Sequence, residues 1–157
     1  MEYEVEIYLL SNKFINDYPQ TKYPELMLKK DRPYSCLIID THEDYFICIP
    51  FRSSISHNNA YIFRGTNRSN RTRSGLDYSK VVLIKDTDYI NSERRAVVDQ
   101  DEFNQAQKNM DRIVNDIIKY IDDYVNHVNG SSALHIREFE RRYKFSTLPY
   151  FHNILGL

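Results

Sequence analysis

The ten residues after an apolar run at positions 45–49 concentrate side chains that could act on a phosphate. Arg52, Ser53 and His57 lie within six residues of one another. RNA is cut without a metal when its own 2′-OH attacks the adjacent phosphate, which requires a base, an acid and donors around the developing charge. Histidine can fill either proton role, arginine matches phosphate oxygens, and serine can orient an oxygen. The pattern fits metal-free RNA cleavage, although a polar turn with a structural histidine has the same composition.

A second group lies in residues 64–75, where arginines alternate with hydroxyl and amide side chains. This mixture is typical of surfaces that contact phosphate and sugar. A solvated surface loop is the alternative interpretation. The residues that we expect to bind RNA, including neighbours of both groups, are Lys30, Ser54, Asn58, Asn59, Arg64, Arg68, Arg71, Arg73 and Tyr78.

Three further charged residues lie at the starts of predicted strands. Asp77 and Lys80 precede the apolar residues 81–84, and Arg32 precedes the apolar run that begins at position 34. We expect Lys80 and Arg32 to act as phosphate cations, and Asp77 to orient an arginine or a histidine. A turn with a surface ion pair, and a solvated basic turn, are the corresponding alternatives.

The charge of the chain is unevenly distributed. Residues 52–80 contain five arginines and one lysine against Asp77 alone, a charge of +5, whereas the whole chain carries −1 and the remainder therefore −6. Polyanion binding depends on the local field more than on the total charge. The basic segment therefore favours a directed polyanion-binding surface.

Other classes of function have little support in the sequence. The five histidines show none of the spacings of a zinc site, and a chain with four glycines has no glycine-rich nucleotide loop, so we expect no metal, no cofactor and no dedicated small-molecule ligand. Carboxylates at positions 86, 88 and 99–102 leave a metal-dependent nuclease as a third possibility. Ser/His/Asp hydrolysis remains possible from the residue types, but Ser53 does not lie in the sequence context of a nucleophile elbow.

The length and apolar content predict one globular domain, residues 1–157. No apolar run approaches the roughly 20 residues that span a bilayer, and the acidic start is unlike a signal peptide. Cys36 and Cys48 lie inside apolar runs, as buried free thiols do. Together these features predict a cytoplasmic protein that does not bind membranes.

Hydrophobic periodicity predicts the secondary structure. Strands are expected at 2–10, 34–40, 45–49, 60–64, 80–84 and 94–98, and a short helix capped by Ser11 is expected to end before Pro19. Residues 23–30 fit either a helical turn or a loop. Residues 51–59 and 65–78 are expected to be loops.

The second half of the chain is predicted to be helical. Apolar residues between 110 and 128 recur at steps of three and one, which predicts one long helix over 101–129 that begins at Asp99 or Asp101 and ends at Gly130. A shorter helix is expected over 133–143. The order of elements predicts an α+β fold, a compact, curled antiparallel sheet or barrel closed by a long C-terminal helix and short helices.

The motifs at 48–59 and 75–80, with Arg32-Pro33-Tyr34 before a central strand, resemble the toxins of type III toxin–antitoxin systems. The closest resemblance is to the CptN branch, and the ToxN, TenpN and AbiQ branches are more distant. Where the ToxN branch has a Thr-Ser pair after the proline-ended strand and a lysine before the preceding strand, this chain has Arg52-Ser53 and Arg32. The resemblance extends from the first strand through the long helix.

The resemblance implies a sheet like that of the Kid/MazF ribonucleases and RNA cleavage without metal, leaving a 2′,3′-cyclic phosphate and a 5′-hydroxyl. It also implies inhibition by a small pseudoknot RNA antitoxin in a closed toxin–RNA assembly, with cellular RNA as substrate. On this hypothesis His57 transfers the proton and Ser53 orients the reacting oxygens. The phosphate charge is stabilised by Arg32, Arg52 and Lys80, and Asp77 orients these cations. A non-catalytic RNA-binding module that uses the same surface is the alternative.

Overall fold

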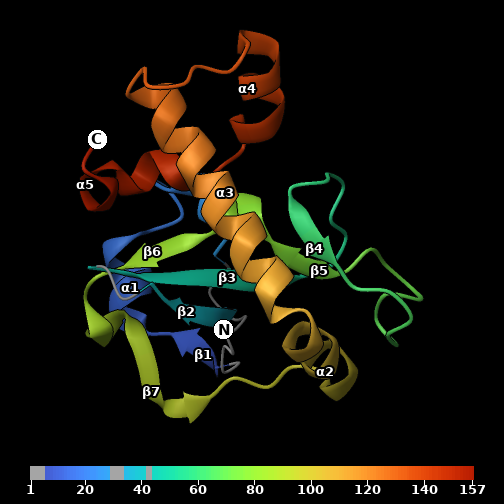
Figure 1. Ribbon diagram of the computed structural model, residues 1–157. Helices are drawn as coiled ribbons and strands as arrows, with labels where there is room; N and C mark the ends of the chain where they lie inside the picture. The colour runs from blue at the N-terminus through green and yellow to red at the C-terminus, as the bar shows by residue number, and fades with distance from the viewer. Residues whose placement is uncertain (1–5, 29–33, 42–43) are drawn as a thin grey trace.

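The computed structural model describes residues 6–28, 34–41 and 44–157, without the side chains of 92–95 (Figure 1). Its strands are β1 Glu6–Leu10, β2 Ser35–Asp40, β3 Phe46–Arg52, β4 Ala60–Ile62, β5 Gly75–Asp77, β6 Val82–Ile84 and β7 Ile90–Arg95. Its α-helices are α1 Asn12–Asp17, α2 Gln100–Lys108, α3 Met110–Val128, α4 Ile136–Tyr143 and α5 His152–Leu155. Short 3-10 helices are η1 Pro24–Leu26, η2 Tyr78–Lys80, η3 Thr87–Tyr89 and η4 Leu148–Phe151.

The strands form one antiparallel sheet in the order β4-β5-β3-β2-β1-β7, with β6 paired to β3. The α+β class is therefore as expected. The expected closure into a strongly curved barrel was wrong, because within the described residues the path of paired strands is open and ends at β4 and β7. β4 pairs with β5 and β7 with β1, and the two end strands are not paired with each other, as closure of a barrel would require.

Strand β3 is paired along one edge with two different strands, β6 and β5. Cys48 pairs with Val82, and Phe51 pairs with Leu76. Between these pairs β3 has two residues, whereas the opposite chain has five, which include η2. One of the two residues of β3 is Pro50, which has no N–H to offer a ladder. The opposite chain therefore bends out of the sheet here, and this bend places Asp77.

The core lies between the sheet and the helices. Strands β2 and β3 each have four consecutive buried residues, as strands covered on both faces do. Helix α3 passes over the sheet in Figure 1 and contributes a buried stripe that includes Ile113, Ile117 and Ile121. Both cysteines are free and fully buried in this core, as predicted, and burial raises the pKa of each thiol.

The single helix expected over 101–129 was wrong, because Asn109 divides it into α2 and α3. The backbone of Asn109 is not helical (φ −116°, ψ 22°), and its side chain donates to the carbonyl of Gln105. Asparagine competes in this way with main-chain hydrogen bonds, which makes it a poor residue inside a helix. Helix α2 is thereby turned away from the line of α3 (Figure 1).

Other expected elements agree with the structure to different degrees. Helix α1 begins after Ser11, whose side chain accepts from the N–H of Phe14 as predicted. The expected strand at 94–98 is β7, which starts earlier and ends at Arg95. Residues 75–77, expected to be loop, form β5, because pairing with β3 and β4 makes a strand of three residues that have no apolar alternation of their own.

Candidate functional site

Asp77 lies at the centre of the candidate site, at the bend between β5 and β6. It is the last residue of β5 and caps η2, where its Oδ1 accepts from the main-chain N–H of Ser79 at 3.0 Å and from the Ser79 hydroxyl at 2.6 Å. Its side chain is only 1% exposed. A carboxylate buried to this degree must be paired, and it therefore organises the side chains around it.

Two of the predicted catalytic residues reach this carboxylate from the end of β3 and the loop that follows. Arg52 Nη1 donates to Asp77 Oδ2 at 3.0 Å. His57 Nε2 lies 3.2 Å from Asp77 Oδ1 and 3.3 Å from Oδ2, and 3.2 Å from the Ser79 hydroxyl. The structure thus joins His57, Arg52 and Asp77 in one cluster, as the sequence hypothesis required.

The hydrogen bonds of His57 assign its tautomer. The main-chain N–H of Asn59 donates to Nδ1 at 3.1 Å, so Nδ1 accepts and the proton of the neutral ring is on Nε2. The Nε2 proton then points to Asp77. A carboxylate in this position holds the imidazole in one orientation.

The environment of Asp77 keeps it ionised. Burial alone would raise its pKa, but hydrogen bonds from His57 and Ser79 and the charges of His57 and Arg52 together lower the pKa below its ordinary value. The site therefore contains a buried negative charge on Asp77. Arg52 balances this charge, and a protonated His57 would add to the balance.

The loop that carries His57 is held in a defined shape. Ser54 has a positive φ of 54°, and its N–H donates to the hydroxyl of Thr72 at 2.9 Å. Arg73 donates to the carbonyls of Ile55 and His57 and to the side chain of Asn58. The expected RNA-binding residue Arg73 thus bridges the two loops, and its contacts position the backbone at His57.

The arginine-rich loop is fastened to α2. Arg68 forms a two-pronged pair with buried Glu102, through Nε at 3.1 Å and Nη2 at 2.8 Å, and Ser74 donates to the same carboxylate. The side chain of Gln105 pairs with both main-chain groups of Arg64. The loop is therefore ordered rather than an independent solvated segment, and Arg68 serves mainly to hold it.

Lys80 and Tyr78 lie away from the solvent side of the site. The Lys80 ammonium, 7% exposed, donates to Glu25 at 2.8 Å and to the carbonyl of Phe145 at 2.7 Å. Tyr78 is buried, its hydroxyl donates to Asp116 at 3.2 Å, and burial raises its pKa. Because η2 turns both side chains inward, Lys80 anchors the bend rather than meeting a phosphate, and Tyr78 offers no open ring for stacking.

The other predicted residues divide between the surface and the undescribed part of the chain. Ser53, Ser54, Asn58, Arg64 and Arg71 are exposed. The half-buried Asn59 donates through its side chain to the carbonyl of Arg142. Arg32 and Lys30 lie outside the described residues.

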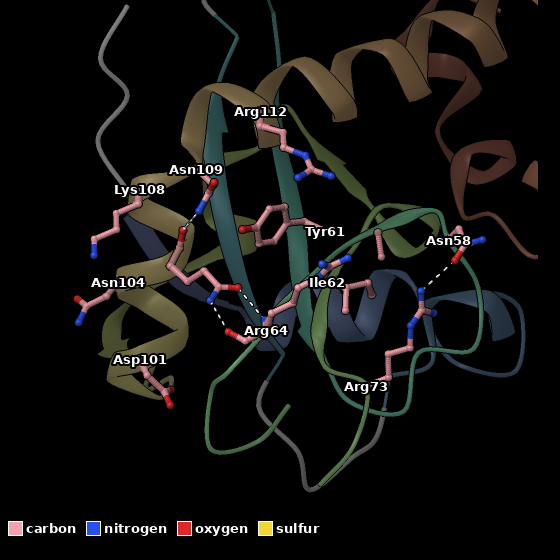
Figure 2. Close-up of a pocket in the computed structure, with 12 residues that line it drawn as sticks. Asn58, Tyr61, Ile62, Arg64, Arg73, Asp101, Asn104, Lys108, Asn109 and Arg112 are labelled. Carbon is pink, nitrogen blue, oxygen red and sulfur yellow. Dashed lines mark hydrogen bonds between the residues drawn. The ribbon is translucent and has the colours of Figure 1, made fainter. Parts of the chain in front are cut away.

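A hollow of about 750 Å³ adjoins the cluster, between β4 and the α2–α3 junction (Figure 2). Its lining includes Asn58, whose side-chain oxygen accepts from Arg73 at 2.9 Å. Figure 2 shows Arg112 descending from α3 toward the ring of Tyr61, and its guanidinium lies 5.5 Å from the ring centroid. The hollow is therefore continuous with the loop that carries His57.

No family model, curated protein or solved structure matches this chain. The site must therefore be interpreted from its own geometry. Among the described residues, no helix is both long and apolar enough to cross a bilayer.

Three of the carboxylates considered for a metal site have other roles. Asp86 accepts from Lys13 and caps η3, Asp101 accepts from the N–H of Asn67, and Glu102 holds Arg68. Across residues 6–28, 34–41 and 44–157, no three His, Cys, Asp or Glu side chains gather as metal ligands would.

Sequence reasoning missed Ser79 and the contributors to the hollow, Tyr61, Lys108 and Arg112. The spacing Asp77-x-Ser79 is a signal for Ser79, since an aspartate commonly caps a turn through the N–H two residues later. The other three had no comparable signal, because only the fold brings the start of α3 over β4.

Proposed function

We propose that this protein is a metal-independent endoribonuclease toxin of a type III toxin–antitoxin system. The observation that carries the proposal is the buried carboxylate of Asp77, which gathers His57 and Arg52 beside the basic loop. A proton-transfer group and a phosphate-binding cation within one cluster are two of the parts that metal-free RNA cleavage requires. The resemblance of the motifs at 48–59 and 75–80 to the CptN branch supports the same assignment.

In the proposed reaction the 2′-oxygen forms a bond to phosphorus and the bond from phosphorus to the 5′-oxygen breaks. The 2′-OH loses its proton to a base and the 5′-oxygen gains one, leaving a 2′,3′-cyclic phosphate and a 5′-hydroxyl. His57 Nε2 faces Asp77, so Nδ1 is the ring atom that exchanges a proton with RNA. Bound RNA would then replace the N–H of Asn59 as the partner of Nδ1.

Charge on the phosphate is stabilised by Arg52. A guanidinium has five N–H donors, more than the single contact with Asp77 uses, and the Arg52 side chain is 24% exposed. Exposed Ser53 adjoins Arg52 and orients or donates to the reacting oxygens. Arg32 is retained as a second cation, whereas Lys80 is assigned to the support of the bend.

The proposal includes a location and partners. The toxin acts in the cytoplasm on cellular RNA as one domain, and a small pseudoknot RNA inhibits it by binding directly in a closed assembly. The exposed arginines of the loop, Arg64 and Arg71, contribute to binding of both RNAs.

The deciding experiment incubates the pure protein in EDTA with an RNA and with its 2′-deoxy copy. We expect cleavage of the RNA alone, with cyclic phosphate ends identified by mass spectrometry. Cleavage of both strands, or cleavage that requires added metal, would contradict the mechanism. His57→Ala provides the control for contaminating ribonuclease, since a contaminant would cleave equally in both preparations.

A non-catalytic RNA-binding module is the second candidate, and one observation favours it. Both ring nitrogens of His57 are engaged within the protein, Nδ1 by Asn59 and Nε2 by Asp77. A structural histidine would be held in the same way. This candidate predicts that wild type and His57→Ala bind RNA equally tightly and that neither yields a product.

A further inference from the structure

The hollow between β4 and the α2–α3 junction is strongly basic. Its lining includes four cationic side chains and the single carboxylate of Asp101, so its local charge is +3. The cations are Arg64, Arg73, Lys108 and Arg112. In a chain of net charge −1, a concave surface of this charge concentrates anions.

A cation–π contact between an arginine and a tyrosine lies in its lining. Arg112 lies over the Tyr61 ring with its side chain 70% exposed, held only loosely by Asp116 at 3.7 Å. The charge of Arg64 also acts on the Tyr61 hydroxyl, together with that of Arg112. Tyr61 itself is buried, so the part of this pair presented to a ligand is the exposed, planar guanidinium of Arg112. Such a group accepts an unpaired base by stacking and a phosphate through its donors.

The hollow and the catalytic cluster share residues. Asn58 and Arg73 line the hollow, and Arg73 also donates to the carbonyl of His57. In the sheet, Ala60 pairs with Asp77 and Tyr61 with Leu76. Ala60, the β4 residue that pairs with Asp77, itself lines the hollow beside Tyr61.

We propose that this hollow binds single-stranded RNA beside the scissile bond, with a base stacked on Arg112 and phosphates held by Arg64 and Lys108. The proposal rests on the proposed function and deepens it by naming where the substrate strand lies. Duplex RNA keeps its bases stacked within the helix, so it cannot use the guanidinium face. A peptide of aspartate and glutamate residues would meet the cations but has no aromatic ring to stack on the guanidinium.

Binding is measured by fluorescence anisotropy with a labelled 2′-O-methyl oligonucleotide in EDTA. This probe has no free 2′-OH, so it reports on the hollow without cleavage. We expect Arg112→Gln and Arg64→Gln each to weaken binding about threefold to tenfold, and the slope of log K against log salt to become shallower by about 0.7. Arg112→Lys keeps the charge and should keep the slope while losing affinity.

The matched control is Arg141→Gln. Arg141 is similarly exposed, at 77%, and has a comparable loose ion pair with a carboxylate one turn away, but it lies on α4 outside the lining of the hollow. It should bind like wild type. Wild-type affinity in both Arg112→Gln and Arg64→Gln would overturn the proposal, as would displacement of the probe by polyglutamate as effectively as by unlabelled oligonucleotide.

The two proposals can fail separately. His57→Ala should abolish cleavage of ordinary RNA, which tests the nuclease separately from binding of the 2′-O-methyl probe. Loss of probe binding in the Arg112 and Arg64 variants, with no cleavage by any protein, would support the hollow and reject the nuclease. Cleavage with unchanged probe binding in those variants would reject the hollow alone.

Discussion

His57 Nε2 lies 3.2 Å from one carboxylate oxygen of Asp77 and 3.3 Å from the other, so the imidazole is held by a buried charge. The two residues come from different segments: His57 from the loop after β3, and Asp77 from the end of β5. Their meeting requires β3 and β5 to pair and the chain to bend after β5. The candidate site therefore depends on the integrity of this corner of the sheet.

His57→Ala should reduce RNA cleavage by about 10²- to 10⁴-fold, the usual contribution of a positioned proton-transfer group. The side chain is 34% exposed, so we expect the variant to fold. Added imidazole should restore part of the activity. The measurement is the initial rate on a fixed RNA. His135→Ala, which removes an exposed histidine at the start of α4, should cleave like wild type, and equal rates for both variants would argue against a role for His57.

Asp77→Asn should lower the free energy of unfolding at neutral pH by about 3 kcal/mol, because it removes one member of a buried charged group. The pKa of Asp77 is lowered in the folded protein, so its stabilising contribution is present above the ordinary value of about 4 and lost as pH falls through the folded value. Urea unfolding between pH 7 and pH 3 should show a smaller pH dependence in the variant. An unchanged dependence would show that Asp77 is not the titrating group.

Lys80→Met should destabilise the protein by about 2 kcal/mol, because Glu25, which is 33% exposed, loses the ammonium that it pairs with at 2.8 Å and the carbonyl of Phe145 loses its donor. Replacing both partners, with Lys80→Met and Glu25→Leu together, should recover much of this loss, since no charge then remains unpaired. A double-mutant cycle measured by urea unfolding gives the coupling energy. A cleavage loss that persists after stability recovers would indicate that Lys80 meets the phosphate after all.

Gly75→Ala should destabilise the protein by about 3 kcal/mol. A Cβ at this position would lie 2.1 Å from the carbonyl oxygen of Tyr61 and would force β4 and β5 apart. The control is Gly65→Ala, which has open space around it but a positive φ of 70° and should cost about 1 kcal/mol. Thermal unfolding compares the two, and equal losses would mean that the close approach of β4 and β5 is not required.

Local sequence patterns predicted the elements whose own residues have a diagnostic hydrophobic run or capping side chain. The apolar runs at β2 and β3 predicted two buried strands, and Ser11 predicted the start of α1 through a bond three residues away. The division at Asn109 and the strand β5 were missed. A single polar residue in a periodic stripe does not show whether a helix continues, and a three-residue strand owes its form to its partners.

The order of residues is sufficient to predict the α+β class, the basic segment, and the presence of His57, Arg52 and Asp77 near strand ends. The role of each charge depends on the folded structure. Lys80, Arg68 and Arg73 have the same sequence signature as exposed cations, yet each meets an acceptor more than ten positions away in the chain. Burial and pairing depend on such long-range contacts, so a basic residue in the sequence shows its charge but not its partner.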